Sequence, residues 1–205
     1  MSSRVTTLVD ALIVRYAKYI PKRLFWEFRA KNIDQLWGTQ QDDYPVLKNI
    51  LQETEAKSIL DIGCGTGRLF PLFLQEKIPI VVGQDVSRWA LRKAKQRYPS
   101  PTIKVIHTPL DKIGMPCVFD LIISNRVLSA VKPDELEKVL KNLFSISKYL
   151  YLNEYSSSDG GQPSSYWFMH DYHVVLSRIC AFNIVEQGKI GKQSYELLKI
   201  GSLDT

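Results

Sequence analysis

From residue 58 onward, short apolar segments alternate with stretches in which apolar residues recur at helical spacing. The apolar segments predict strands at 58–62, 79–84, 102–107, 119–124, 148–154, 182–188 and 194–200. The stretches between them predict helices at 67–76, 87–97, 133–146 and 165–181, and a short connector at 108–118. Alternating strands and helices are typical of a mostly parallel sheet that helices cover on both faces. The pattern therefore predicts a three-layer α/β fold around a seven-stranded sheet.

The last two predicted strands break this alternation. Only a short link containing Gly191 and Lys192 joins them. A parallel pair needs a crossover connection of roughly a dozen residues or more, so this pair is expected to be an antiparallel C-terminal hairpin.

The first 57 residues show helical periodicity without a strand pattern. The predicted helices cover 4–20, 22–37 and about 43–55. Pro21 separates the first two, and Pro45 lies in the first turn of the third. We expect residues 1–57 to form a helical extension and residues 58–205 to form the main domain.

Composition places the chain among ordinary globular proteins. Its 205 residues are 45% hydrophobic and 23% charged, which suits one domain with a sizeable core. The three cysteines, at 64, 117 and 180, lack metal-type spacing and suggest free thiols in a reducing compartment. Charged residues interrupt the N-terminal apolar stretch, so no signal peptide is predicted, and no apolar run could span a membrane. A cytoplasmic location is expected.

The net charge of +6 is unevenly distributed. Residues 1–40 hold seven Lys and Arg against three Asp and Glu, a balance of +4. Such an excess at one end can bind nucleic acid or an anionic surface. A solvated helix face explains it equally well, and we favour that interpretation.

The segment from Asp61 to Gly67 has the sequence Asp-Ile-Gly-Cys-Gly-Thr-Gly and lies between a predicted strand and a predicted helix. Glycines allow a sharp turn and a close approach of a ligand, while a helix start directs free N–H groups to the same place. A dinucleotide-binding loop needs its third glycine at the sixth position, where this chain has Arg68. The pattern Asp-x-Gly-x-Gly-x-Gly instead resembles the first motif of the class I S-adenosylmethionine-dependent methyltransferases.

This resemblance implies a Rossmann-like fold and S-adenosyl-L-methionine as the cofactor. It covers roughly residues 58–200 and is specific only across 58–87 and 119–128. In the family, the glycine loop wraps the methionyl part of the cofactor, and the acidic residue, here Asp61, accepts hydrogen bonds near the cationic amino group. The loop residues implied to bind the cofactor are Gly63, Cys64, Gly65 and Gly67.

The next strand ends in Asp85, where a carboxylate can accept hydrogen bonds from both ribose hydroxyls. A role as helix cap is the alternative, but Ser87 is better placed for that. Val86 is expected on the adenine side. Relatives usually carry an acid near position 108 to bind the adenine amine, and this chain has Thr108. The Thr108 hydroxyl, the Leu110 backbone or Asp111 could substitute.

The tail of the fourth strand, at Ser124, is expected to face the reacting sulfonium, whereas Asp120 lies at the other end of that strand and is interpreted as structural. The Asn-Pro-Pro-Tyr type of amine-binding motif is absent there. Pro116-Cys117 precedes this strand, so a cytosine-type cysteine nucleophile is not indicated. No acid set suggests a metal site.

Two residues are candidate catalytic bases. Glu154 ends the fifth strand on the side of the sheet where ligands bind. His170 shares a predicted helix face with Tyr166, His173 and Ser177, and it could take up a proton near neutral pH. An ion pair for Glu154 and a surface or loop-anchoring role for His170 are the alternatives.

The overall pattern resembles small-molecule and glycan-pathway methyltransferases, which implies methyl transfer to an oxygen or nitrogen of a small or sugar-type acceptor. In such proteins an N-terminal extension commonly forms a lid over the cofactor and shapes the acceptor pocket. Two alternatives stay open: an RNA or protein methyltransferase that docks through its basic N-terminus, and a cofactor-binding protein without catalysis.

Overall fold

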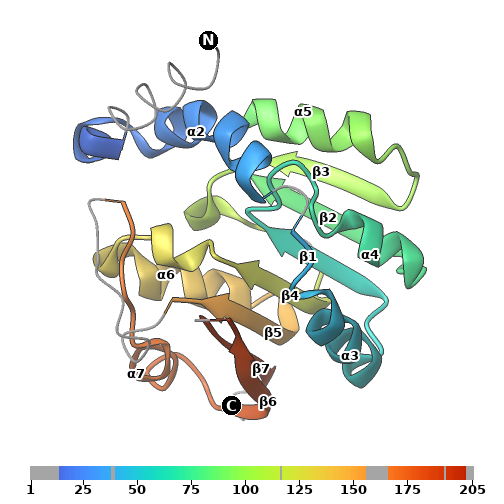
Figure 1. The fold of residues 1–205 in the computed structure, drawn as a ribbon. Coiled ribbons are helices and arrows are strands. Elements are labelled where there is room, and N and C mark those ends of the chain that lie inside the picture. Colours follow the sequence, from blue (N-terminus) through green and yellow to red (C-terminus); the bar gives the residue numbers. More distant parts are fainter. Residues whose placement is uncertain (1–13, 38–39, 116, 156–165, 192, 202–205) are drawn as a thin grey trace.

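The computed structural model describes residues 14–37, 40–115, 117–155, 166–191 and 193–201. A seven-stranded sheet in the order β3-β2-β1-β4-β5-β7-β6 forms its centre (Figure 1). The strands are β1 (Ser58–Ile62), β2 (Ile80–Asp85), β3 (Ile103–His107), β4 (Phe119–Asn125), β5 (Ser147–Glu154), β6 (Phe182–Ile190) and β7 (Gln193–Ile200). Every predicted strand is therefore confirmed to within two residues at each end.

Strand directions also follow the prediction. The first five strands pair in parallel, and β7 is antiparallel to both β5 and β6. Gly191, in the turn between β6 and β7, has a left-handed backbone with φ +61°. Strand β7 lies between β5 and β6, so β6 forms the edge of the sheet although it precedes β7 in the chain.

Helices cover both faces of this sheet (Figure 1). The α-helices are α2 (Lys22–Trp37), α3 (Tyr44–Thr54), α4 (Phe70–Gln75), α5 (Arg88–Arg97), α6 (Pro133–Phe144) and α7 (Tyr172–Leu176). Short 3-10 turns are η1 (Ala17–Tyr19), η2 (Leu110–Lys112) and η3 (Leu128–Ala130). One core contains α3, α4 and α5 side chains around Ile59, and the other contains α6 and α7 side chains around Leu60. Neighbouring residues of a strand point to opposite faces of the sheet and therefore enter different cores. The result is three layers, with the sheet between two layers of helices.

The helix predicted over 165–181 was wrong. Only Tyr172–Leu176 is helical, and residue 165 lies outside the described residues. Asp171 caps α7 by accepting a hydrogen bond from Val174 N at 3.0 Å, which sets the helix start. Before that point the chain is bound to another segment, since Phe168 N donates to Ser129 O at 2.7 Å.

Two other helix boundaries also differ from the prediction. The helix expected from residue 67 begins at Phe70, because Gly67 still has a left-handed φ of +83° and belongs to the turn. In the helix expected over 4–20, residues 4–13 lie outside the described residues, and the chain from Ala17 to Tyr19 is a 3-10 turn.

Asp120 has the structural role that its position predicted. Its Oδ2 accepts hydrogen bonds from Lys57 N, Ser58 N and Ser58 Oγ at 2.9–3.0 Å. Its Oδ1 forms a 2.7 Å ion pair with Lys148. Partial burial alone would raise the pKa of Asp120, but Lys148 and the Lys57 and Ser58 donors lower it to about 2. The carboxylate thus ties the starts of β1, β4 and β5 together.

We predict that Asp120→Asn lowers the free energy of unfolding at pH 7 by about 1.5–3 kcal/mol, the scale of hydrogen bonds to a charged group. The folded pKa lies below the unfolded value of 3.8, so this stabilisation is present above pH 4 and is lost as the pH falls towards 2. Urea unfolding of both proteins at pH 7 and pH 3 measures it. A difference that stays constant between these pH values would contradict the role of the charge.

Candidate functional site

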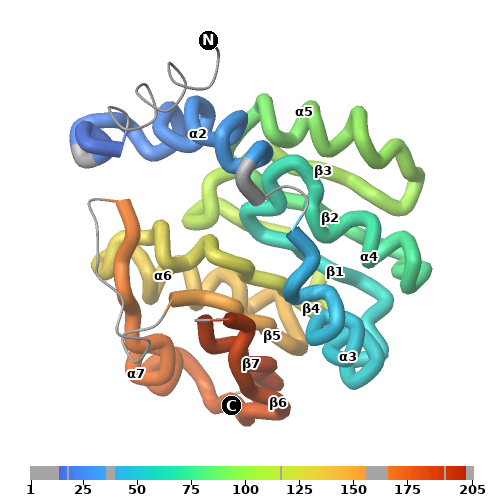
Figure 2. Tube along the Cα trace, viewed as in Figure 1, coloured from blue at the N-terminus to red at the C-terminus, as the bar shows by residue number. Residues whose placement is uncertain are grey.

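A cavity of about 630 Å³ opens at the carboxyl ends of β1, β2 and β4. This volume is within the usual range for pockets that bind small ligands. Segments after these strands form its floor, and residues of α2 line it from the other side. Figure 2 shows α2 running beside α5, above the end of β1. The site therefore lies at the edge of the sheet where the sequence placed it.

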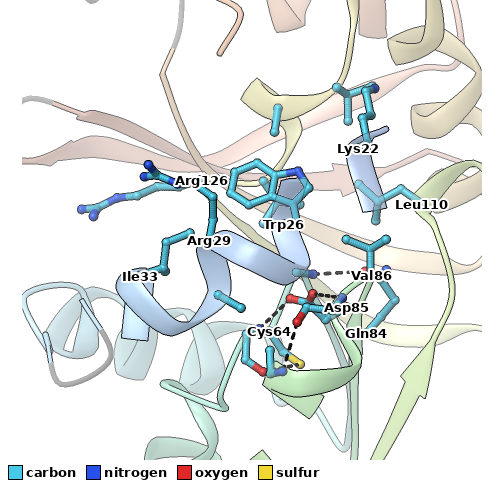
Figure 3. A pocket seen from close by; sticks show the side chains of 18 of the residues that line it. Lys22, Trp26, Arg29, Ile33, Cys64, Gln84, Asp85, Val86, Leu110 and Arg126 are labelled. Atoms are coloured by element: carbon cyan, nitrogen blue, oxygen red, sulfur yellow. Dashed lines mark hydrogen bonds between the residues drawn. The ribbon is translucent and has the colours of Figure 1, made fainter. Parts of the chain in front are cut away.

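Most of the predicted cofactor residues meet in this cavity (Figure 3). Gly63, Cys64, Gly65, Asp85, Val86 and Leu110 line it. Asp61, Gly67, Thr108 and Ser124 are not among its lining residues. Six of the ten predicted cofactor residues therefore line the cavity, and the other four do not.

All three glycines of the loop have a left-handed backbone, and two of them, Gly63 and Gly65, have different surroundings. Gly63 has φ +57°, and a Cβ there would lie 2.5 Å from Cγ2 of Val127. Gly65 has φ +56°, but a Cβ there would meet no protein atom within 4 Å, because it would point into open space. Gly63 is thus required by packing, whereas Gly65 keeps the cavity itself clear.

Asp85 is fixed by the backbone of the same loop. Its Oδ2 accepts a hydrogen bond from Gly65 N at 2.9 Å, and its Oδ1 accepts one from Ser87 N at 2.7 Å. Burial raises the pKa of Asp85, and these N–H donors partly oppose the rise. The helix cap belongs to Ser87, whose Oγ accepts from Ala90 N at 3.1 Å. The Asp85 carboxylate is thus positioned at the cavity wall with lone pairs left to accept further hydrogen bonds.

Asp61 is a buried carboxylic acid, with only 3% of its surface exposed. Its Oδ2 has no hydrogen-bond partner among the described residues. The pKa of Asp61 is raised to about 8, mainly by burial. Arg68 opposes this rise, and the charges of Asp85 and Asp43 add to it. A buried carboxylate without donors is costly, so this side chain is suited to a cationic group brought by a ligand.

On the side expected to face adenine, the structure has one contact that the sequence did not predict. Gln84 at the end of β2 donates from Nε2 to Thr108 O, and its Oε1 accepts from Gly63 N at 3.1 Å. The Thr108 backbone is therefore used to fix the loop after β3. Leu110 and Asp111 line the cavity instead, and Asp111 lies 3.8 Å from Lys138.

A buried polar cluster that the sequence did not predict locks the glycine loop from its other side. Arg68 forms a two-pronged ion pair with Asp43, with both N···O distances 2.7 Å. Asn125 at the end of β4 also donates to Asp43. Tyr44 donates from its hydroxyl to Arg68 O at 2.6 Å. The only sequence signal was the arginine at the sixth loop position.

Contacts from α2 hold it against the main domain. Asp34 accepts hydrogen bonds from Arg97 at 2.5 and 2.7 Å and from Thr66 Oγ1 at 2.5 Å. Glu27 accepts from Trp89 N at 3.2 Å, at the start of α5. Since Thr66 belongs to the glycine loop, α2 is tied directly to the cavity floor.

Glu154 is not placed to act as a base. Its carboxylate accepts five hydrogen bonds, from Ser124 Oγ, Val127 N, Leu128 N, Ser129 N and Ser129 Oγ, at 2.6–3.1 Å. It is 2% exposed and does not line the cavity. Five donors saturate its lone pairs, so the predicted catalytic role is corrected to a structural one. The same contact turns Ser124 away from the expected sulfonium.

His170 is likewise not placed for catalysis. It is 4% exposed, and its Nε2 lies 3.0 Å from Val131 O. The rings of Phe168 and Tyr172 pack near its imidazole, with centroids 6.2 and 5.5 Å away. Burial lowers the pKa of His170, and the contact with Val131 only partly opposes this. A neutral imidazole bound to a carbonyl anchors the chain to the η3 turn, which corrects the predicted role.

The predicted helix face around His170 does not exist. Tyr166 lines the cavity, whereas His173 is exposed and lies 2.8 Å from Glu196 Oε2. Tyr166 is carried to the cavity by the non-helical segment before α7.

Comparisons with known proteins agree with this site. A family model described as a methyltransferase domain matches residues 59–149. An uncharacterized methyltransferase of Mycobacterium tuberculosis is 29% identical over 101 residues, covering 49% of this chain and 50% of that protein. The human tRNA N(3)-cytidine methyltransferase is 29% identical over 136 residues, covering 61% of this chain and 47% of that protein.

A solved structure shares the whole fold. It is the 1,6-didemethyltoxoflavin-N1-methyltransferase of Burkholderia thailandensis with its bound substrate and S-adenosylhomocysteine. The TM-score is 0.70 at 15% identity, covering 88% of this chain and 87% of that chain.

Residues 59–149 thus resemble a methyltransferase-domain family, and the fold is that of solved methyltransferase structures. The cofactor of that family is S-adenosylmethionine, and the residues around Gly65 and Asp85 fit it: an open glycine turn, a wall carboxylate, and a buried acid for a cation. The chain spans about half the length of the curated relatives it matches.

Two other features of the described residues bear on function. None of the described helices is both long and apolar enough to cross a membrane. The same part of the chain contains no group of three or more His, Cys, Asp or Glu residues placed to hold a metal ion.

We predict that Gly65→Ala weakens binding of S-adenosylhomocysteine by about tenfold or more, because the new methyl group overpacks the ligand space, at a cost of about 1–3 kcal/mol. The matched control is Gly191→Ala, which has the same left-handed backbone and equally open surroundings but lies in the β6–β7 turn. Both variants should lose about 1–2 kcal/mol of stability.

Calorimetry with S-adenosylhomocysteine and thermal unfolding separate the two effects. If the two variants bind the ligand equally well, Gly65 is only a turn residue and the cavity floor is not the cofactor site.

Proposed function

We propose that this chain transfers the methyl group of S-adenosylmethionine to an oxygen or nitrogen atom of a small organic acceptor. The sulfonium of that cofactor is already activated, so alignment of the acceptor supplies much of the rate acceleration. A dedicated buried base is not needed for an acceptor that is already nucleophilic at neutral pH.

The observation that carries the proposal is the character of the cavity beyond the cofactor floor. Four aromatic side chains line it: Trp26, Tyr155, Tyr166 and Trp167. They come from α2, from the end of β5 and from the segment before α7, which surround the cavity. Pockets for small ligands are typically concave and lined by aromatic and apolar groups with a few polar ones. Such a lining suits a planar organic molecule better than a macromolecular backbone.

In this proposal α2 is the lid of the site and residues 1–57 are its helical extension. The Asp34 contacts with Arg97 and Thr66 support this, since they join the lid to α5 and the glycine loop. The Burkholderia structure, which was solved with bound 1,6-didemethyltoxoflavin, is consistent with it.

The test is methyl transfer from S-adenosylmethionine with a labelled methyl group to a cell extract that has been separated into small-molecule, RNA and protein fractions. We expect label in the small-molecule fraction. Asp85→Asn is the control, because loss of a charged acceptor at the ribose position should weaken cofactor binding by about 1.5–3 kcal/mol and reduce labelling in parallel.

A second candidate acceptor is tRNA. The human relative acts on tRNA, and the basic excess of residues 1–40 could contact phosphates. Label in the RNA fraction would favour this candidate over a small molecule. Tight binding of S-adenosylhomocysteine with no labelled fraction would instead indicate a cofactor-binding protein without catalysis.

We infer that Asp61 binds the cationic amino group of the cofactor through its own hydrogen bonds or through water. Its raised pKa of about 8 means that it must lose a proton to do so near neutral pH. Affinity for S-adenosylhomocysteine should therefore rise by about 25-fold between pH 6.5 and 8.5, because the ionised fraction of a group with a pKa of about 8 rises from about 3% to about 76%.

Calorimetry across this range measures the effect. Asp61→Asn should remove the pH dependence, whereas Asp111→Asn, another carboxylate at the cavity wall, should retain it. The same slope in wild type and Asp61→Asn would assign the titration to a different group.

A further inference from the structure

Helix α5 is strongly basic. Its ten residues, Arg88–Arg97, include five Arg and Lys and no Asp or Glu. It packs on β2 and β3 and runs beside α2 (Figure 1). Ala90, Leu91 and Ala94 form its buried side, so most of the cations lie on the side that faces away from the sheet.

Three of these cations form one exposed row. Arg88, Arg92 and Lys95 are spaced by four and three positions, which places them on one helix face, and all three are exposed. In the described part of the chain, none of the three forms an ion pair with a carboxylate. None of them lines the cavity. These three residues are called the basic row of α5.

Helix α2 does not neutralise this row. The carboxylates that α2 directs at α5 are those of Glu27 and Asp34, and both have partners. Glu27 accepts a hydrogen bond from Trp89 N, and Asp34 forms a 2.5 Å ion pair with Arg97. Helix α2 also adds a cation, because the amine of Lys31 lies 5.9 Å from the centre of the Trp89 ring. The surface formed by the two helices is therefore positively charged.

Folding alone does not favour this distribution of charge. Arg88 lies in the first turn of α5, where the helix dipole favours negative side chains, and α5 has no acidic residue there. Arg88 and Arg92 are four positions apart, as are Lys93 and Arg97. Like charges at this spacing destabilise a helix.

Helix α6 shows the more usual arrangement within the same protein. Asp134 and Glu135 occupy its first turn, and Glu137 pairs with Lys141 at 2.8 Å. Mixed charges of this kind keep a helix face solvated without repulsion. The uniform charge of α5 needs another explanation, and attraction of an external polyanion provides one.

The composition of the exposed face indicates which polyanion is bound. No large hydrophobic side chain of α5 is exposed. A helix that binds a membrane surface needs an apolar face, and the centre of a protein–protein interface is apolar. A nucleic acid requires neither, since its phosphates bind to Arg and Lys charges, and guanidinium groups form paired hydrogen bonds with phosphate oxygens.

We propose that the basic row of α5 binds the phosphate backbone of a nucleic acid. Ser87 and Ala90, which are close to Arg88 in the chain, line the cavity, so a bound strand would lie beside the cavity that we assign to the cofactor. This inference goes beyond the proposed function, because it does not depend on which molecule accepts the methyl group.

The experiment measures binding of a labelled single-stranded RNA of mixed sequence to the full chain, without cofactor, by fluorescence anisotropy between about 50 and 200 mM salt. Three phosphate contacts predict a slope of about −2 for the logarithm of the association constant against the logarithm of the salt concentration, since each contact to a single strand contributes about 0.7. An RNA of one repeated base should bind equally well, because phosphate contacts carry no sequence information.

The combined variant Arg88→Gln, Arg92→Gln and Lys95→Gln should bind this RNA about tenfold or more weakly at the lowest salt concentration, and its slope should be smaller by about 2. Its melting temperature should not fall, because the substitutions remove repulsion between like charges. The variant Arg88→Lys with Arg92→Lys keeps the charges and should keep the slope.

The matched control combines Lys57→Gln, Arg178→Gln and Lys189→Gln. It removes the same amount of positive charge from exposed positions outside α5. This control should keep the affinity for RNA within about twofold of the wild type, because contacts to phosphates are made at short range.

Absence of RNA binding at the lowest salt concentration, equal weakening in the α5 variant and the control, or tighter binding of polyglutamate or phosphatidylserine vesicles than of RNA would overturn the proposal. Because no cofactor is present in this experiment, these outcomes leave the proposed function unaffected. Failure to bind S-adenosylhomocysteine would overturn the proposed function alone, so the two failures are distinguishable.

Discussion

The site depends on one buried carboxylate, that of Glu154. Its five hydrogen bonds collect Ser124 at the end of β4 and the backbone of residues 127–129 that follows. Without these bonds the orphan N–H groups of that turn would be buried without partners, at about 1–3 kcal/mol each. This turn also fixes the position of Val127, against which Gly63 packs. It fixes the strained backbone of Arg126 as well. A single acidic residue on β5 thus positions both the glycine loop and one wall of the cavity.

The second constraint joins the N-terminal segment to the same loop. Asp43 binds Arg68 and Asn125, and Asp34 binds Thr66 and Arg97. These contacts make α2 and the chain before α3 part of the cavity rather than an independent attachment. Surface ion pairs contribute little to stability, but Asp43 is 4% exposed, and losing one partner of a buried pair leaves an uncompensated charge. The N-terminal segment and the glycine loop are therefore coupled energetically.

Much of the fold could be predicted because its signals are local. Apolar runs such as 58–62 predict buried strands. The closely spaced glycines at 63, 65 and 67 predict a turn with a left-handed backbone. The role of Glu154 could not be predicted, since its donors lie 25–30 residues earlier in the chain. The helix around His170 failed for a related reason: its periodicity was correct, but contacts with Ser129 and Val131 hold the segment extended. In both cases contacts between segments that are distant in the sequence decided the outcome, and the local sequence pattern does not contain them.

The remaining chemistry of the cavity is electrostatic. Asp85 lines the cavity where the proposed cofactor brings two ribose hydroxyls. Arg29 and Arg126 lie on the other side of Trp26. Complementary charges select partners and fix their orientation more than they add affinity. In a site without a buried base, this polarity is the means by which the protein would align acceptor and methyl group.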